Sequence, residues 1–289
     1  MLKIIVPISF LAVLIDYSGW MHKIDFILAP AMNLLSLPPT AALPLIVGML
    51  TGIYGGIAAM VVFPLTNNEM TLIAIFLLIS HNLIQEGIIQ GKSGLNPVKA
   101  TLFRLTASSV TVMIVARFLG TEPGRLLEKS ASAAAHPPLL LMVKSWFAAT
   151  LFLSAKIFMI IMVIMILLET MKIFNMIHHI VRVLRPLLKT MGLNQVVGLL
   201  WLTAVVFGIA YGGAVIVEET KEGHIKKEEL EKLHLSIGIN HSMVEDPALF
   251  LSLGLSAFWL WIPRFILAIV AVRLLDLYYK IRFRILNFQ

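Results

Sequence analysis

The stretch SHNLIQEG, from Ser80 to Gly87, interrupts a long apolar run, and NHSMVEDP, from Asn240 to Pro247, does the same about half a chain later. A shift of 160 places, from position 80 to position 240, superimposes the two stretches without a gap. It aligns four pairs of similar residues: His81 with His241, Glu86 with Asp246, Gly94 with Gly254, and Arg104 with Arg264. Apolar composition alone does not place ionisable residues at matching positions. The chain is therefore predicted to be an internal duplication with paired polar sites.

The composition of the chain indicates a membrane protein. Hydrophobic residues make up 59% and charged residues 13%, whereas a soluble domain is about 45–50% apolar and about 25% charged. A helix crosses the hydrocarbon layer with about 20 mostly apolar residues. Several windows meet that condition: 2–20, 41–64, 71–90, 98–119, 139–169, 194–217, 234–254 and 255–276. The predicted fold class is all-α, a multi-pass helical membrane protein.

Charge and cysteine usage exclude other classes of function. The formal net charge is +7, but the basic residues stand beside apolar segments, as Arg182, Lys189 and Arg282 do. This placement is typical of membrane topology, so no nucleic-acid partner is expected. The chain has no Cys, which excludes disulfides, thiolate metal sites and cysteine nucleophiles.

The sequence divides into three parts by composition. They are a first repeat at 1–120, a linker at 121–138 rich in Gly, Pro, Ser and Ala, and a second repeat at 139–289. The second repeat carries a charged insertion at about 218–234. Each repeat also has an amphipathic segment, at 21–37 and 171–192, which is expected to lie in the membrane interface.

A glycine-bearing segment occurs in each repeat, PLIVGMLTGIYGGIAAM from Pro44 and LTAVVFGIAYGGAVI from Leu202. Two interpretations stay open. The glycines let helix backbones pack closely, or Gly55-Gly56 and Gly212-Gly213 break the helix at membrane depth and expose main-chain groups to a solute. The candidate residues for either role are Gly52, Tyr54, Gly55, Gly56, Tyr211, Gly212 and Gly213.

The ionisable residues of the two polar stretches are the candidate functional site. A charge at the bilayer centre costs at least about 2.5–3.5 kcal/mol, so such residues are expected to face a cavity or a partner. The candidates for binding a solute or ion are His81, Asn82, Gln85, Glu86, Asn240, His241, Glu245 and Asp246. Arg104 and Arg264 are expected to pair with Glu86 and Asp246. A network that only holds helices together is the alternative.

Helix breakers follow both acids, since Gly87 comes after Glu86 and Pro247 after Asp246. Both residues weaken a helix, so two interpretations are kept for each segment: it crosses the membrane, or it is a re-entrant segment.

The stretch LIDYSGWMHKIDFILAPAMNLLSLPPTAALPLIVGM, from Leu14, resembles the nucleoside-recognition, or Gate, family, as do the two polar stretches. That family includes the spore maturation proteins A and B, and similar domains form the membrane part of the ferrous iron transporter B. The resemblance implies two Gate-like halves, a transporter-like fold with inverted repeats, and a bacterial cytoplasmic membrane. It departs at Thr51 and Gly52, where the iron transporter has a Cys-Asn pair proposed to handle metal. The GTPase motif of that transporter is also missing.

Three classes of function remain for comparison. The first is a transporter of a small polar solute or ion, such as a nucleoside-like solute or a divalent cation, with proton coupling open. The second is a non-transporting membrane subunit of the spore-maturation type, whose partner is another subunit or a second copy. The third, an enzyme, is not expected, because the chain has no nucleophile elbow and no HExxH motif. No cofactor is expected, and a metal ligand set is left open.

Overall fold

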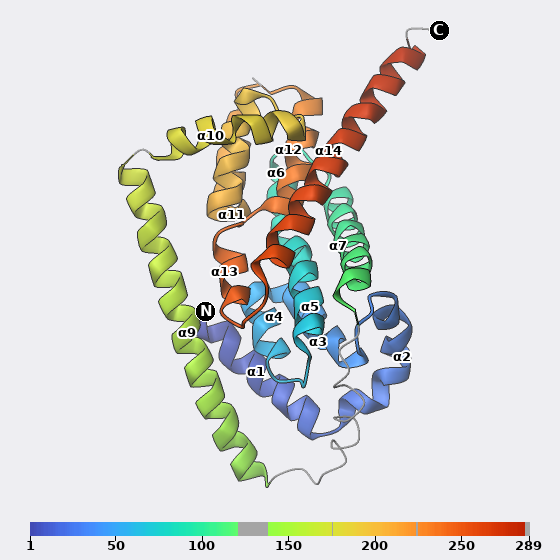
Figure 1. Cartoon of the computed structure of the whole chain (residues 1–289), viewed down its shortest axis with the longest axis vertical. Helices are drawn as coiled ribbons and strands as arrows, with labels where there is room; N and C mark the ends of the chain where they lie inside the picture. The colour runs from blue at the N-terminus through green and yellow to red at the C-terminus, as the bar shows by residue number, and fades with distance from the viewer. Residues whose placement is uncertain (121–137, 175, 224, 287–289) are drawn as a thin grey trace. The chain divides into compact units, whose positions relative to one another are not determined.

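The computed structural model describes residues 1–120, 138–174, 176–223 and 225–286. The regular elements in these ranges are helices (Figure 1), which confirms the all-α prediction. The linker predicted at 121–138 lies outside them except for its last residue.

The helices fall into two sets along the chain. Before the linker they are α1 Leu2–Tyr17, α2 Trp20–Leu34, the 3-10 helix η1 Pro39–Ala41, α3 Ala42–Thr51, α4 Ile53–Met60, α5 Asn67–Ser80, α6 Leu83–Lys92 and α7 Pro97–Leu119. After the linker they are α9 Leu139–Ile173, α10 Met176–Met191, α11 Gln195–Lys221, α12 Lys227–Asn240, α13 Glu245–Leu251 and α14 Ala257–Leu286.

Four helical stretches of the described chain are long and apolar enough to cross a membrane: Asn67–Lys92, Pro97–Leu119, Leu139–Met171 and Ala257–Arg282. A fifth is counted if the bent pair Lys23–Leu34 and Pro39–Thr51 forms one span. The multi-pass character is thus confirmed. There are fewer such helices than apolar windows, because breaks near Gly52, Gly208 and His241 divide several windows into shorter helices.

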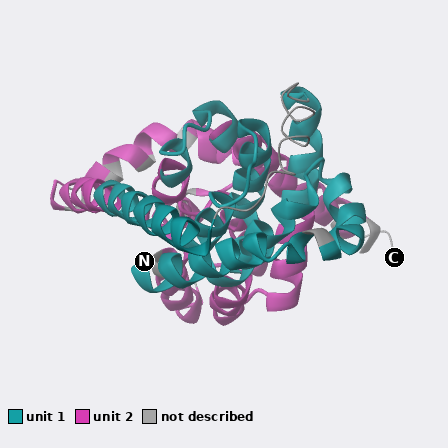
Figure 2. Ribbon diagram, turned by 90° about the horizontal axis from the view of Figure 1, so that it is seen from below, with its two compact units in different colours: residues 1–82, 108–160, 249–260 teal, residues 83–107, 161–248, 261–289 magenta. Residues whose placement is uncertain are grey.

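The chain forms two compact units that interleave along the sequence (Figure 2). Unit 1 comprises residues 1–82, 108–160 and 249–260, and unit 2 comprises residues 83–107, 161–248 and 261–289. The boundaries between the units fall between α5 and α6 and inside α7, α9, α13 and α14. The repeats at 1–120 and 139–289 were inferred from sequence similarity, a different property from compactness, and they stay a prediction.

The core of unit 1 forms where α3 and α4 pack against each other and α5 packs against both. Two glycines let Leu77 of α5 come close. A Cβ atom at Gly48 would lie 2.5 Å from Leu77 Cδ2, and one at Gly56 would lie 2.4 Å from Leu77 Cδ1. Side-chain-free surface of this kind lets membrane helices approach, so close packing explains both glycines.

The core of unit 2 forms around α11, which packs against α6, α10 and α12. Trp201 of α11 is buried and donates its Nε1–H to Ser236 Oγ of α12 at 2.7 Å. A Cβ atom at Gly213 would lie 2.3 Å from Ile89 Cγ2 of α6. Gly213 is therefore also a close-packing glycine.

Candidate functional site

Two helix breaks lie against each other in unit 1. Gly52, between α3 and α4, has φ 90° and ψ −177°, a conformation that glycine adopts at little cost. The second break follows α5, where His81 is extended and Asn82 has φ 48°. The N–H of Asn82 donates to the carbonyl of Gly48 at 3.1 Å. This bond fixes the end of α5 against the last turn of α3.

Unit 2 contains the same local arrangement. Gly208 interrupts α11 with φ 79° and ψ 169°. After α12, His241 is extended and Ser242 has φ 49°. The N–H of Ser242 donates to the carbonyl of Ala204 at 3.2 Å, and Met243 N–H donates to Val205 O at 2.7 Å. Each unit therefore holds two helix breaks that are joined by main-chain hydrogen bonds. The main-chain polar groups at these breaks are potential ligand contacts.

The breaks are not at the glycine pairs named from the sequence. Of the two interpretations left open for Gly55-Gly56 and Gly212-Gly213, a helix break does not fit, because these residues continue helices α4 and α11. The backbone turns instead at Gly52 and Gly208. Tyr54 is half-buried on α4, and the side chain of Tyr211 lies outside the described part of the chain.

Five buried ionisable residues form a cluster in unit 2. They are Glu86 on α6, Arg104 on α7, His241 after α12, Asp246 on α13 and Arg264 on α14, and each is at most 7% exposed. Arg104 Nη1 lies 2.7 Å from Glu86 Oε2, and His241 Nε2 lies 3.3 Å from the same oxygen. We call this set the buried charge cluster.

Arg264 holds the end of α12. Its Nε donates to the carbonyl of Ile239 at 3.0 Å, and its Nη2 donates to the carbonyls of Ile239 and His241 at 2.8 and 2.9 Å. Carbonyls at a helix C-terminus lack intrahelical partners, and a guanidinium there satisfies them. Arg264 was expected to pair with Asp246, but its hydrogen bonds go to the main chain.

Asp246 contributes to the cluster electrostatically. Its carboxylate attracts both Arg104 and Arg264, and Glu86 also attracts Arg264. Two acids and two guanidinium groups thus compensate one another inside unit 2. Such compensation is required, because an isolated buried charge is strongly unfavourable.

Asn240 lies in the sequence between Ile239 and His241, the two residues whose carbonyls accept hydrogen bonds from Arg264, and it is fully buried. Among the described residues, neither its amide nitrogen nor its amide oxygen has a hydrogen-bond partner, and the same is true of Arg264 Nη1. A buried polar group without a partner costs about 1–3 kcal/mol. These atoms could therefore bind a polar ligand favourably.

The remaining predicted site residues are distributed as follows. His81 and Asn82 form the turn after α5 in unit 1, where His81 is buried and Asn82 is half-buried. In unit 2, Gln85 is exposed and Glu245 is half-buried, while their neighbours Glu86 and Asp246 are buried. One face of α6 is therefore turned inward at Glu86.

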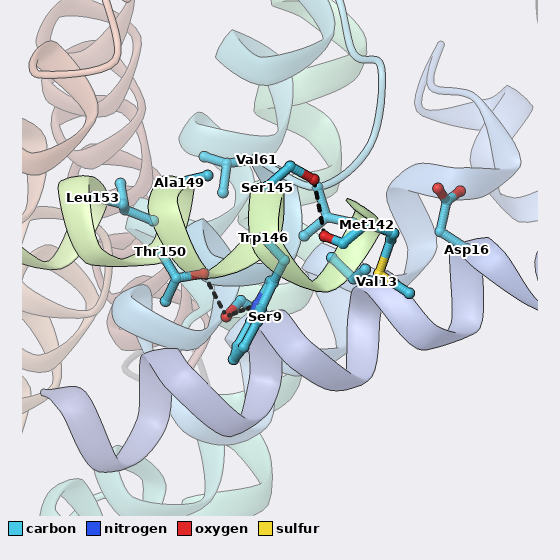
Figure 3. A pocket seen from close by; sticks show the side chains of 11 residues that line it. Ser9, Val13, Asp16, Val61, Met142, Ser145, Trp146, Ala149, Thr150 and Leu153 are labelled. Carbon is cyan, nitrogen blue, oxygen red and sulfur yellow. Dashed lines mark hydrogen bonds between the residues drawn. The ribbon is translucent and has the colours of Figure 1, made fainter. Parts of the chain in front are cut away.

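Sequence reasoning missed a pocket of about 380 Å³ in unit 1, between α1 and the first part of α9 (Figure 3). Trp146 Nε1–H donates to Ser9 Oγ at 3.1 Å, and Ser9 Oγ lies 3.3 Å from Thr150 Oγ1. Asp16 lines the pocket farther along α1, away from this polar group (Figure 3). Ser and Thr on apolar helices were the available signal, but they are common in membrane helices and did not single the pocket out.

Comparison with known proteins shows which family and which relative the chain is similar to. Residues 1–122 match the family described as Gate, nucleoside recognition. The chain is 25% identical over 270 residues, covering 93% of this chain and 86% of the relative, to the uncharacterized membrane protein YvoD of Bacillus subtilis (strain 168). No solved structure matches the chain. The predicted family resemblance is thereby confirmed for residues 1–122, which are similar to the Gate, or nucleoside-recognition, family, and the protein is a multi-pass membrane protein.

Proposed function

We propose that the protein moves a small polar solute or an ion across a cell membrane, and that the buried charge cluster changes its protonation state during transport. The Gate match over residues 1–122 and the apolar spans support a transporter-like role. The paired helix breaks in each unit support it too, because broken helices are a common way for transporters to present main-chain groups to a solute.

The observation that carries the proposal is the environment of His241. Its Nδ1 lies 2.9 Å from the carbonyl of Ile237, and a carbonyl oxygen can only accept a hydrogen bond. Nδ1 therefore carries a proton. His241 Nε2 then faces Glu86 Oε2 at 3.3 Å, a contact that is attractive only if a second proton sits on His241 or on Glu86. The pair has a place for one exchangeable proton.

Loss or gain of that proton alters the whole cluster. When Glu86 is ionised it neutralises Arg104 at 2.7 Å. When Glu86 is neutral, Arg104 loses its closest negative partner, and a buried guanidinium must then be balanced elsewhere. Asp246 is the other acid that attracts Arg104. Protonation would thus redistribute the ion pairs at the break between α12 and α13.

The polar atoms beside the cluster suit a solute with both donors and acceptors, such as a nucleoside-like compound. Asn240 offers an amide that can do both, and Arg264 Nη1 offers a donor. Carboxylate and imidazole groups also suit a divalent cation, which makes such a cation the second substrate class. Gln85 and Glu245 are the further proposed contacts in unit 2, and His81 and Asn82 are proposed contacts at the helix break of unit 1.

Reconstituted protein tests the proposal. Proteoliposomes would be challenged with nucleosides and with divalent cations, with and without a pH gradient. Glu86→Gln and Asp246→Asn would be compared with Glu218→Gln, which removes an acid whose side chain is 71% exposed. We expect both cluster variants to impair uptake and Glu218→Gln to leave it unchanged.

The non-transporting subunit is the alternative. The Arg104–Glu86 pair and the bonds of Arg264 to α12 would stabilise a membrane subunit without any solute. If folded wild-type protein moves no tested solute, or if the cluster variants transport as well as wild type, the subunit function replaces the transporter proposal.

A further inference from the structure

A second polar pocket, of about 920 Å³, lies in unit 2 at the ends of three helices. Its lining comes from the start of α7, the start of α12 and the last turns of α14: Lys99, Lys227, Glu228, Glu231, Asp276, Tyr278, Tyr279, Lys280, Arg282 and Arg284. Because α7 begins and α14 ends here, and both contain candidate spans, the pocket lies at one face of the membrane.

Two of its three acids are engaged within the protein. Asp276 binds Lys232 at 2.8 Å and Lys280 at 2.9 Å, and Glu231 accepts the hydroxyl hydrogen of Tyr279. Burial is the largest influence on Lys232 and lowers its pKa, but the hydrogen bond to Asp276 and the attraction of Glu229 outweigh burial and raise it. Lys232 therefore stays charged and continues to neutralise Asp276.

The remaining lining is strongly basic. In the part of the chain that the structure describes, Lys99, Lys227, Arg282 and Arg284 are exposed and have no carboxylate within ion-pairing distance. Glu228 is the acid that remains beside them. Tyr278 is 56% exposed at the same place, and tyrosine is enriched where lipid headgroups meet water.

We infer that this pocket binds the phosphate headgroup of an anionic phospholipid. Guanidinium groups donate paired hydrogen bonds to phosphate oxygens, and lysines add charge. Basic residues next to membrane spans attract anionic lipids. The volume is within the range of small-molecule sites. This inference is independent of the proposed transport function.

Binding of defined lipids to the full chain in detergent tests the inference, with native mass spectrometry as readout. Phosphatidylglycerol and phosphatidylcholine with the same acyl chains would be compared. We expect wild type to prefer phosphatidylglycerol, and Lys99→Gln/Arg282→Gln/Arg284→Gln to bind it about a hundredfold less tightly, because each of the three surface cations contributes to anionic-lipid attraction. Lys3→Gln/Lys23→Gln/Lys144→Gln removes the same charge at exposed positions in unit 1 and should retain the preference.

Two further measurements distinguish headgroup binding from misfolding of the glutamine variant and from binding of free phosphate. Arg282→Lys/Arg284→Lys keeps the charge and should keep most of the binding if the pocket recognises an anion. Glycerol 1-phosphate and inorganic phosphate would be added as competitors. Equal binding of both lipids by wild type, or equal loss in both triple variants, overturns the inference. Soluble phosphate that binds as tightly as the lipid overturns the assignment to a headgroup.

Discussion

The carboxylate of Glu86 lies 3.3 Å from Nε2 of His241, and this relationship links two segments that are far apart in the sequence. Glu86 belongs to the first polar stretch and His241 to the second, yet both are buried in unit 2. Helix α6 brings the acid to the end of α12, where the main chain fixes the imidazole through Nδ1. An acid of the first stretch and the imidazole of the second therefore belong to the same buried cluster.

Glu86→Gln is expected to lower stability. The substitution leaves Arg104 buried without its 2.7 Å partner, and breaking a buried pair in this way costs about 3–5 kcal/mol. Thermal unfolding in detergent is the measurement. Glu218→Gln is the control, expected to stay within about 0.5 kcal/mol of wild type because surface substitutions have small effects. Equal stability of the two variants would contradict the ion pair.

Substitutions at Gly52 and Gly56 are expected to destabilise for different reasons. Gly52→Ala introduces a side chain at φ 90° but meets no heavy atom closer than 3.9 Å, so its cost is conformational. Gly56→Ala places a Cβ 2.4 Å from Leu77, so its cost is steric. Double-mutant cycles with Leu77→Ala distinguish the two, with coupling expected for Gly56 and almost none for Gly52.

Solute uptake by the Gly52 and Gly56 variants provides a functional measurement beside their stability. If Gly52 acts at the site as well as in folding, Gly52→Ala should reduce solute uptake more than Gly56→Ala at matched stability. Coupling of Leu77 to Gly52 as strong as its coupling to Gly56 would show that packing explains both glycines.

Composition was sufficient to predict a helical membrane protein, because a chain so poor in charged residues cannot form an aqueous surface. The cost of burying charge was sufficient to single out Glu86, Asp246 and the two arginines. The expected pairing of Arg104 with Glu86 is present, but the sequence could not give the partners of Arg264. Arg264 bonds to carbonyls of α12, and main-chain acceptors are invisible in a sequence because every residue has one.

The positions of the helix breaks could not be predicted from the sequence either. The Tyr-Gly-Gly motif pairs Gly55 with Gly212, but Gly212 lies four residues after its break at Gly208, and the residue four after Gly52 is Gly56. The alignment of the two repeats by the Tyr-Gly-Gly motif therefore differs by one residue from the alignment by their helix breaks. A sequence does not show whether a glycine provides a positive φ or space for a neighbouring side chain. Only the main-chain conformation distinguishes the two roles.

Arg264→Lys is expected to loosen the end of α12 although it keeps the charge. The guanidinium reaches the carbonyls of Ile239 and His241 together, whereas an ammonium lacks that planar arrangement of donors. Losing one charged hydrogen bond costs about 1.5–3 kcal/mol. Hydrogen exchange of the amides from 239 to 243 should accelerate, while those of α5 in unit 1 should not. Unchanged exchange at 239 to 243 would contradict the role assigned to Arg264.

The last prediction concerns proton coupling. His241→Gln removes the imidazole that shares a proton site with Glu86, so uptake should lose most of its dependence on pH while some transport remains. His179→Gln is the matched control, since His179 is exposed on α10 and should leave the pH profile unchanged. Uptake by proteoliposomes across a range of internal and external pH is the measurement, with thermal unfolding to establish that each variant is folded. If the wild-type profile is flat, no proton is coupled. If His241→Gln keeps the wild-type profile, Glu86 and His241 do not form the proton-binding pair, and the coupled proton must bind elsewhere.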